Sequence, residues 1–295
     1  MQPLDYLNTT MGLIWVIACI PLGFVMTALG YLLINRIPAK WLCDYGETPS
    51  EELTSGVRIK FIWTGIPVSL LMSASLVLCR LQFNKGYDIY FGFLALIIFV
   101  CFIIAIADIK YQIIPDQFTI ALGVLALGVS LYDILRDYCI FHLAWWSPLA
   151  GAGIGAVAMI LIDFLGAIIY HKEGMGFGDV KLFLALGILT GFPGTIYTFI
   201  ISLITATVCF VIVIAAAKIF FRKKEETDET KPEKTEEKKE TGDEEETDEE
   251  ENEADGSIGF GSYLAFGPYI AIAACAYIAL FDQIQYLAKL YLNLF

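Results

Sequence analysis

The chain has 295 residues, of which 57% are hydrophobic and 17% are charged. A mean hydropathy of +0.67 excludes an ordinary soluble domain and makes the number of membrane spans the first question. The formal charge of −13 comes mostly from residues 222–256, which hold 18 acidic and 7 basic side chains. The charge of the whole chain therefore indicates neither an acidic nor a basic substrate. We expect no nucleic-acid partner.

Each expected transmembrane helix is a run of roughly 20 mostly apolar residues. In chain order the runs are 12–34, 60–80, 89–107, 117–135, 147–170, 179–192, 195–220 and 263–281. The sixth run is short and interrupted by glycine, which neighbouring helices can accommodate. The first run lacks a basic segment before it and a small-residue cleavage site after it, so we expect a retained helix and no removed signal peptide. The predicted fold is an all-α polytopic membrane protein with about eight transmembrane helices.

The acidic run divides the chain into three segments. Residues 1–221 hold the first seven expected helices, residues 222–257 form the charged segment, and residues 258–295 hold the last helix and a C-terminal tail. The middle segment has no large apolar residue and cannot bury a core, so we predict a disordered acidic linker on the cytoplasmic side. Its role is left open.

The seven cysteines are scattered along the chain and form no CxxC pair. Most of them lie within apolar runs, where a free cysteine behaves as a small hydrophobic residue. The sequence therefore predicts neither a disulfide framework nor a zinc site.

The distribution of lysine and arginine predicts the orientation in the membrane. With eight spans, the loops that follow odd-numbered helices hold more of these residues than the other side, even without the acidic segment. Lys and Arg favour cytoplasmic loops, so we expect the odd-numbered loops to be cytoplasmic and both termini to lie outside. In this topology Asp108 and Asp179 lie at membrane boundaries on the same cytoplasmic face.

Acidic residues in or beside a membrane span are costly, so each needs a reason. Asp116 follows Pro115 and opens the run QFTIALGVLALGV, where a helix N-cap explains it well. Asp163 lies inside the fifth run, in ILIDFLGAIIY, and the sequence offers it no partner. Its role is open.

Asp108 and Asp179 have less ordinary surroundings. Asp108 ends the third run, in FIIAIADIKYQIIPD, where an acid opposes the helix dipole. Asp179 follows Gly176 and Gly178 in EGMGFGDVKL. These glycines allow close approach of another backbone or a positive φ, and a tight capped loop explains Asp179 equally well.

As a pair, these two acids suggest peptide hydrolysis. Two carboxyls in one low-dielectric site share a single proton. The ionised carboxyl can then draw a proton from water while the protonated one polarises a peptide carbonyl. No competing arrangement is present, because the two histidines, His142 and His171, fall on opposite sides of the membrane and no HExxH occurs.

Four stretches together resemble the type IV prepilin peptidase family, which belongs to the GxGD aspartyl membrane peptidases. DIKYQIIPDQFT is similar to its first aspartate motif and EGMGFGDVKLFLALG to its second. YLLINRIP resembles the end of the family's first helix, and FGSYLAFGPYIA resembles its last-helix FGP motif. The stretches occur in family order and, together with the spans between them, cover most of the chain apart from the acidic segment.

The resemblance implies an aspartic endopeptidase of the bacterial plasma (inner) membrane. Such enzymes remove the short basic leader of prepilins, pseudopilins or competence pilins after a glycine, at the cytoplasmic boundary. Carried over to this chain, the catalytic residues are Asp108 and Asp179. The supporting or substrate-binding residues are Gly176, Gly178, Pro115, Lys110 and Lys181. The expected partners are prepilin-type precursors and membrane lipids, and the oligomeric state is left open.

One departure from the family pattern concerns metal and methylation. Many members carry two CxxC pairs that bind zinc after the first helix, and they methylate the new N-terminus with S-adenosylmethionine. Residues 37–60 hold only Cys43 here, so we predict no metal. Proteolysis needs no cofactor, and S-adenosylmethionine is expected only if methylation is retained, which the sequence leaves open.

Two other functions fit parts of the sequence. A presenilin-like protease shares the GxGD feature but cuts within transmembrane helices, whereas the Ile-Pro-Asp and FGP stretches favour the prepilin reading. A proton-coupled transporter could use Asp108, Asp163 and Asp179, although no convincing internal repeat supports it.

Overall fold

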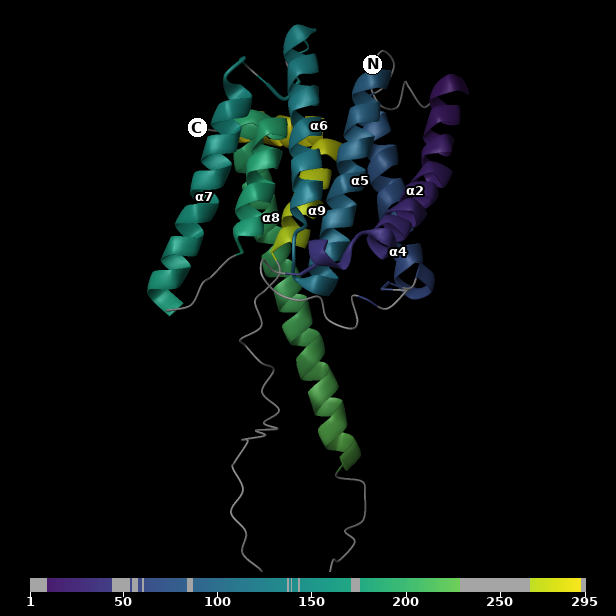
Figure 1. Cartoon of the computed structure of the whole chain (residues 1–295), viewed down its shortest axis with the longest axis vertical. Helices are drawn as coiled ribbons and strands as arrows, with labels where there is room; N and C mark the ends of the chain where they lie inside the picture. Colours follow the sequence, from purple (N-terminus) through teal and green to yellow (C-terminus); the bar gives the residue numbers. More distant parts are fainter. Residues whose placement is uncertain are drawn as a thin grey trace, which may run out of the picture. The chain divides into compact units, whose positions relative to one another are not determined.

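The computed structural model describes residues 10–43, 54, 58–59, 61–83, 87–136, 138, 140–142, 144–170, 176–228 and 266–292. Within these residues every regular element is a helix, which confirms the predicted all-α class (Figure 1). The elements are α2 (Thr10–Arg36), the 3-10 helix η1 (Ala39–Trp41), α4 (Phe61–Gln82), α5 (Asp88–Tyr111), α6 (Asp116–Leu135), α7 (Ser147–Tyr170), α8 (Phe177–Asp228), α9 (Gly267–Ala279) and α10 (Phe281–Leu292).

The chain divides into two compact units. The larger unit comprises Met1–Ala206 and Ala265–Phe295, and the smaller one comprises Thr207–Leu264. The smaller unit contains the last part of α8, which is helical as far as Asp228. Residues 222–228, which we expected in the acidic linker, therefore belong to a helix. Residues 229–257 lie outside the described part of the chain.

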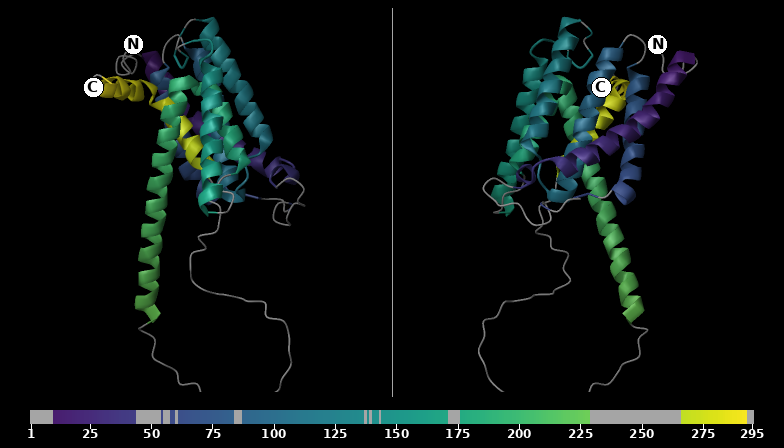
Figure 2. Two further views of the ribbon diagram at one scale, coloured as in Figure 1. Left: turned by 90° about the vertical axis from the view of Figure 1, so that its left-hand side faces the viewer. Right: turned by 45° about the vertical axis from the view of Figure 1, so that its right-hand side comes forward.

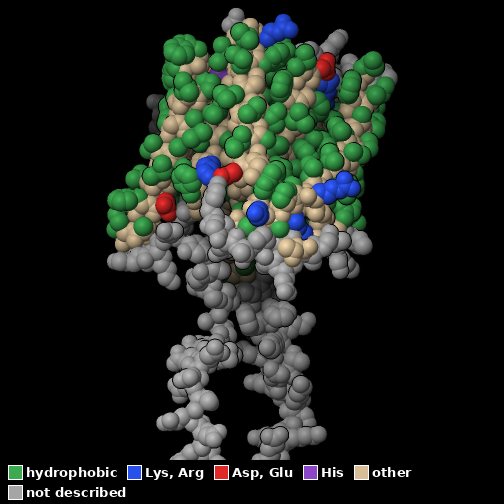
Figure 3. Space-filling model, viewed as in Figure 1, with side chains coloured by type: hydrophobic (Ala, Val, Ile, Leu, Met, Phe, Trp, Pro, Cys, Tyr) green, Lys and Arg blue, Asp and Glu red, His purple; other side chains and the backbone are tan. Residues whose placement is uncertain are grey.

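Apolar side chains cover the helices of the larger unit, as a lipid-facing surface requires. Figure 3 shows few charged side chains among them. Many of the exposed residues are large and hydrophobic, for example Leu131 on α6 at 58% exposure and Val157 on α7 at 64%. Six helices in the described part are long and apolar enough to cross a membrane, and α9 with α10 forms a seventh candidate if this bent pair is one span. The chain is therefore a multi-pass membrane protein.

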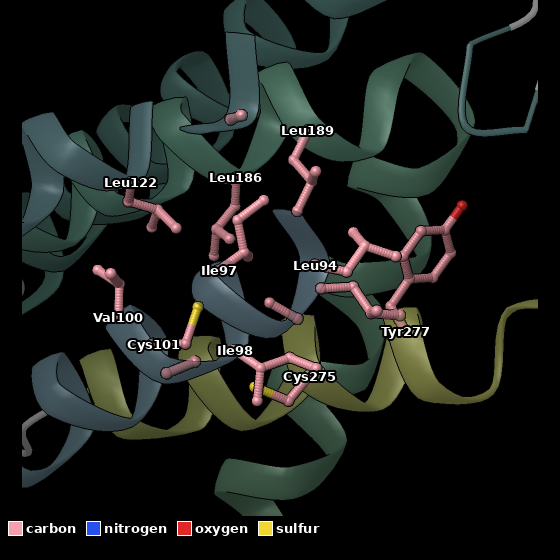
Figure 4. Close-up of a cluster of buried hydrophobic side chains, with 14 of the residues drawn as sticks. Leu94, Ile97, Ile98, Val100, Cys101, Leu122, Leu186, Leu189, Cys275 and Tyr277 are labelled. Carbon is pink, nitrogen blue, oxygen red and sulfur yellow. The ribbon is translucent and has the colours of Figure 1, made fainter. Parts of the chain in front are cut away.

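Helix α5 is the centre of the larger unit. It packs against α2, α4, α6 and α9. Because α5 is apolar around its whole circumference, it can be buried on every side. Figure 4 shows Ile98 and Cys101 of α5 in one buried cluster with Cys275 of α9. The last turn of α5, which carries Asp108, is thereby fixed by helices on several sides.

Helix α8 reverses its direction at Gly191. This residue has φ 66° and ψ −176°, a conformation that is essentially restricted to glycine. The ring centroids of Phe183 and Phe199 are 5.8 Å apart, whereas sixteen residues of straight helix would separate them by about 24 Å. Residues 177–190 therefore form a first arm that folds back on the residues after Gly191.

A buried polar network holds this reversal in place. Ser147 Oγ accepts a hydrogen bond from the Phe192 N–H at 3.1 Å. Asp133, which is fully buried, accepts hydrogen bonds from the backbone N–H groups of Ile140, Phe141 and His142 at 3.2–3.3 Å. These hydrogen bonds hold the loop between α6 and α7 against the end of α6. Phe141 and His142 of this loop pack against Gly191.

By length and composition, the described part of the chain gives six or seven candidate spans, where we expected about eight. The difference arises because α8 counts once although its two arms correspond to the expected helices 179–192 and 195–220. The last expected helix, 263–281, is also different. Helix α9 ends at Ala279 and α10 departs from it at 83°, which Figure 2 shows as a bend in the yellow segment.

The first prediction concerns the turn at Gly191. A Cβ atom at this residue would lie 2.6 Å from Ser147 Oγ and 2.8 Å from His142 Nδ1, in a backbone conformation that other residues avoid. Gly191→Ala should therefore lower the free energy of unfolding by about 2–4 kcal/mol. Thermal unfolding in detergent measures this. Gly153→Ala on α7 is the matched control, since no atom lies within 4 Å of its Cβ position, and it should not destabilise. Equal unfolding temperatures for the two variants would contradict the assignment.

The second prediction concerns His142, which lies in the loop between α6 and α7 and is 3% exposed. Burial lowers its pKa from 6.5 to about 4, so the folded protein holds the neutral ring. The unfolded chain binds a proton near pH 6.5, and the contribution of His142 to stability is complete above that pH and is lost as the pH falls towards 4. His142→Gln, which does not titrate, should show a weaker loss of unfolding temperature over that interval than the wild type. Parallel curves for the two proteins would refute the prediction.

Candidate active site

Asp108 lies in the last turn of α5 and is only 4% exposed. The helix closes at Gln112, which adopts a left-handed conformation with φ 55° and donates its N–H to the Asp108 carbonyl at 2.8 Å. The chain then passes through Ile113, Ile114 and Pro115 directly into α6. This short connection fixes the end of α5 against the start of α6.

The N-terminus of α9 closes the other side of Asp108. The N–H of Gly267 donates a hydrogen bond to the Asp108 carboxyl. A Cβ atom on Gly267 would lie 2.5 Å from Asp108 Oδ2, so only glycine fits without movement of the carboxyl. Gly267 lies in the FGP stretch that resembles the family's last-helix motif, but the sequence predicts no role for this residue. A backbone donor carries no side-chain signal that a sequence could reveal.

Asp179 reaches the same place from α8. It is the third residue of that helix, is 6% exposed, and donates its N–H to the Gly176 carbonyl at 3.0 Å. Asp108 is the charged group that acts electrostatically on Asp179. The structure therefore brings together the two acids that are 71 positions apart in the sequence.

One oxygen of this pair stands out. Within the described part of the chain, Asp179 Oδ1 is buried and has no hydrogen-bond partner. Buried carboxyl oxygens are almost always paired, so an orphaned one at this position needs an explanation. A substrate or a water molecule that enters the site would supply the missing partner.

The two glycines before Asp179 differ in their surroundings. A Cβ atom on Gly178 would lie 3.1 Å from the Ile114 Cβ, so α8 packs closely on the connection between α5 and α6. Gly176 is exposed, and the nearest atom to its Cβ position is the Gly178 nitrogen at 4.0 Å. Neither glycine has a positive φ, which among the described glycines occurs only at Gly191, so the sequence alternative of a positive φ is wrong here.

Asp116 is not the N-cap that we expected. Pro115 is the N-cap residue of α6 and makes no side-chain capping bond, while Asp116 begins the helix. The Asp116 carboxylate instead forms an ion pair with Lys181 at 2.8 Å, which connects α6 to the first turn of α8. The capping interpretation failed because the sequence did not reveal that a lysine from α8 would reach this carboxylate.

The other supporting residues surround the same end of the helices. Lys181 Nζ also lies 4.9 Å from the centroid of the Phe177 ring. Lys110 is exposed, donates a hydrogen bond to the Arg58 carbonyl, and lies over the Tyr111 ring. Lys110 therefore attaches the segment around Arg58 to the end of α5. None of these contacts joins Lys110 to the two buried acids.

The remaining acids lie elsewhere. Asp163 is half-buried in α7, and its role is still open. Asp133 was missed as a buried acid, although its position in SLYDILRD near the end of an apolar run was a usable signal. It binds three backbone N–H groups at the end of α6 remote from Asp116, so its surroundings explain it structurally. His171 lies outside the described residues.

The described residues offer no group of side chains for a metal ion. Among the described residues, no three His, Cys, Asp or Glu side chains are grouped so that they could bind one. Cys43, the only cysteine between residues 37 and 60, donates its thiol to the Lys40 carbonyl. The absence of a zinc site stays a prediction.

Comparison with known proteins finds one family and several relatives that are similar to parts of this chain. The sequence model of the type IV leader peptidase family matches residues 95–211, a stretch that includes Asp108, Gly178 and Asp179 but not Gly267. A prepilin leader peptidase/N-methyltransferase of Xanthomonas campestris pv. campestris is 30% identical over 161 residues, 52% of this chain and 52% of the relative. One from Stutzerimonas stutzeri is 22% identical over 253 residues, 70% of this chain and 84% of the relative.

A third relative, leader peptidase HopD of Escherichia coli, is 34% identical over 94 residues, 31% of this chain and 56% of the relative. No solved structure matches the chain. The chain spans about half the length of the first and third of these relatives. The fold and the site define a polytopic membrane protein with two acids buried together at the ends of two helices. Residues 95–211 of this chain are similar to the type IV leader peptidase family.

The third prediction separates the two glycines of the GxGD stretch. Gly178→Ala should lower kcat by at least about tenfold and also lower the unfolding temperature, because the added methyl group pushes Asp179 away from Asp108. Gly176→Ala should leave the unfolding temperature unchanged and raise KM, because its Cβ projects into open space beside Asp179. Steady-state kinetics and thermal unfolding of both variants test this. If Gly176→Ala unfolds early and Gly178→Ala does not, the packing described here is wrong.

Proposed function

We propose that this chain is a prepilin-type leader peptidase. It cleaves the basic leader of type IV pilin-like precursors after a glycine, at the cytoplasmic boundary of the membrane. The observation that carries the proposal is the meeting of Asp108 and Asp179, both nearly fully buried, at the adjoining ends of α5 and α8. The similarity of residues 95–211 to the type IV leader peptidase family supports the same reaction.

The proposed chemistry uses the two carboxyls and one water molecule. The carboxylate of the pair removes a proton from the water, whose oxygen attacks the scissile carbonyl carbon, while the protonated carboxyl gives its proton to the carbonyl oxygen. As the C–N bond of the resulting tetrahedral diol breaks, the amine nitrogen takes the proton that the water had lost. One hydroxyl of the diol returns its proton to the carboxyl that had protonated the carbonyl oxygen. Each step moves protons only between the two acids, the water and the substrate.

The position of the acids supports cleavage at the membrane boundary over cleavage within a substrate helix. Asp108 lies in the last turn of its span and Asp179 in the first turn of its own. A presenilin-like protease, the alternative from the same class, cuts inside a transmembrane segment. Mapping the cut position on a substrate distinguishes the two.

We propose a location in the bacterial plasma (inner) membrane with the site facing the cytoplasm. Of the basic residues whose side chains are described, five lie at the end of the larger unit that holds the two acids: Arg36, Lys40, Arg58, Lys110 and Lys181. Arg80 and Lys289 lie in the last turns of α4 and α10, and Arg136 is the C-cap residue of α6. This asymmetry agrees with the rule that cytoplasmic loops are rich in Lys and Arg.

The proposed partners are prepilin or pseudopilin precursors and membrane lipids. Proteolysis by two aspartates needs neither a metal nor an organic cofactor. S-adenosylmethionine would be a cosubstrate only if the chain also methylates the new N-terminus, as the names of two relatives state for those proteins. No step of the proposed mechanism depends on it.

The fourth prediction tests the catalytic pair. Asp108→Ala and Asp179→Ala should each reduce cleavage of a co-expressed prepilin reporter by at least about a thousandfold, because either change removes one of the two proton carriers. Asp116→Asn is the matched control. Its ion pair with Lys181 is about 30% exposed on both sides and contributes about 1 kcal/mol at most, so most activity should survive.

Mass spectrometry of the reporter gives the readout for these variants. In the wild type it reports the cut position together with any added methyl group. Activity that persists in either alanine variant would defeat the proposed pair. A cut inside the hydrophobic segment of the reporter would favour the presenilin-like alternative.

A further inference from the structure

The α9 N-terminus distinguishes the two acids from each other. Gly267, the first residue of α9, is buried, and its N–H donates a hydrogen bond to the Asp108 carboxyl. Its Cβ position is blocked by Asp108 Oδ2 at 2.5 Å and by Ile114 Cδ1 at 2.9 Å. The close approach of this backbone donor therefore requires glycine. Gly267 lies outside the stretch that matches the family model.

Asp179 lacks an equivalent donor. Its Oδ1 atom is buried without a hydrogen-bond partner in the described part of the chain. An N–H that donates to a carboxyl stabilises the ionised form, whereas a buried carboxyl oxygen with no donor favours the protonated form. The two acids are therefore not equivalent, although both are buried to nearly the same degree.

The dipoles of α5 and α8 favour the negative charge on Asp179 and not on Asp108, but this effect is weaker. Asp108 closes α5, where the dipole disfavours a negative charge, and Asp179 opens α8, where the dipole favours one. A hydrogen bond to a charged group outweighs a helix-end dipole interaction of this kind. The first turn of α9 also points its positive end at Asp108, which offsets the α5 dipole.

We infer that Gly267 is a positioning residue whose N–H keeps the charge of the pair on Asp108. Asp108 is then the base that takes the proton from water, and Asp179 is the acid that gives its proton to the scissile carbonyl oxygen. This inference rests on the proposed peptidase function and assigns the two roles within it. When the C–N bond breaks, Asp108 returns its proton to the amine and Asp179 regains its own from the diol.

The groups that face Asp108 come from each element around it. Helix α8 contributes Asp179, α9 contributes the Gly267 N–H, and the connection after α5 contributes the apolar Ile114. Lys110 on α5 is bound to the Arg58 carbonyl, and Lys181 is paired with Asp116. Among these described groups, Asp179 acts on Asp108 electrostatically and Gly267 through its N–H, so these two set where the proton resides.

Infrared difference spectroscopy of the full-length protein tests where the proton resides without requiring activity. The probe is the C=O stretch of a protonated carboxyl at neutral pH, compared between wild type, Asp108→Asn and Asp179→Asn. The band should disappear in Asp179→Asn and persist in Asp108→Asn. Any other pattern overturns the inference. A wild-type protein that cleaves no prepilin reporter would refute the proposed function, while the infrared result would still decide the location of the proton.

Kinetics of Gly267→Ala test the positioning role. The added methyl group displaces the Asp108 carboxyl from its donor, so kcat should fall by at least about tenfold with little change in KM. The acid limb of the pH–rate profile should also move upwards by about one pH unit, since Asp108 loses the hydrogen bond that favours its charged form.

Gly92→Ala on α5 is the matched control, because nothing lies within 4 Å of its Cβ position, and its profile should coincide with that of the wild type. A lower kcat with an unmoved acid limb in Gly267→Ala would mean that Gly267 serves packing alone. If Gly267→Ala does not fold, the infrared comparison of the two Asn variants decides the question.

Discussion

Two carboxyl groups can be buried side by side at a membrane boundary only if the pair carries about one negative charge, because each buried ion costs several kcal/mol of lost hydration. Asp108 and Asp179 meet this condition when they hold one proton between them. The pair also needs a partner for the remaining charge, and the Gly267 N–H is available to Asp108. This requirement explains why the ends of α5, α8 and α9 meet at the two acids.

Close approach without side-chain bulk brings these helix ends together. Gly178 lets the start of α8 rest on Ile114, and Gly267 lets the start of α9 reach Asp108. Ile114 touches both glycine positions, so the short connection between α5 and α6 is the common wall of the site. The Asp116–Lys181 pair adds a polar contact between α6 and α8 just outside this wall. Glycine is therefore needed here for packing and for access to a carboxyl.

The sequence predicted the parts of this arrangement that depend on local pattern. Long apolar runs located α4, α5, α6 and α7 closely, and the separate runs 179–192 and 195–220 anticipated the two arms of α8. What failed depended on contacts between distant segments. Nothing near Asp116 revealed that Lys181 would pair with it, and nothing near Gly267 revealed that its backbone would face a carboxyl. The bend between α9 and α10 also escaped, because the run 263–281 is continuously apolar in sequence.

The position of Asp179 is set at both ends of a short arm. Twelve residues separate Asp179 from Gly191, about 18 Å of helix, and a helix of this length transmits displacement with little bending. At the far end the reversal is held by Ser147 and by the loop that Asp133 organises through three backbone N–H groups. At the near end Gly178 rests on Ile114. A change at either end moves the same rigid arm, so the turn at Gly191 bears on the distance between the two acids although it lies far from them. The positive φ at Gly191 and the missing side chain at Gly267 therefore both help to place the two carboxyls together.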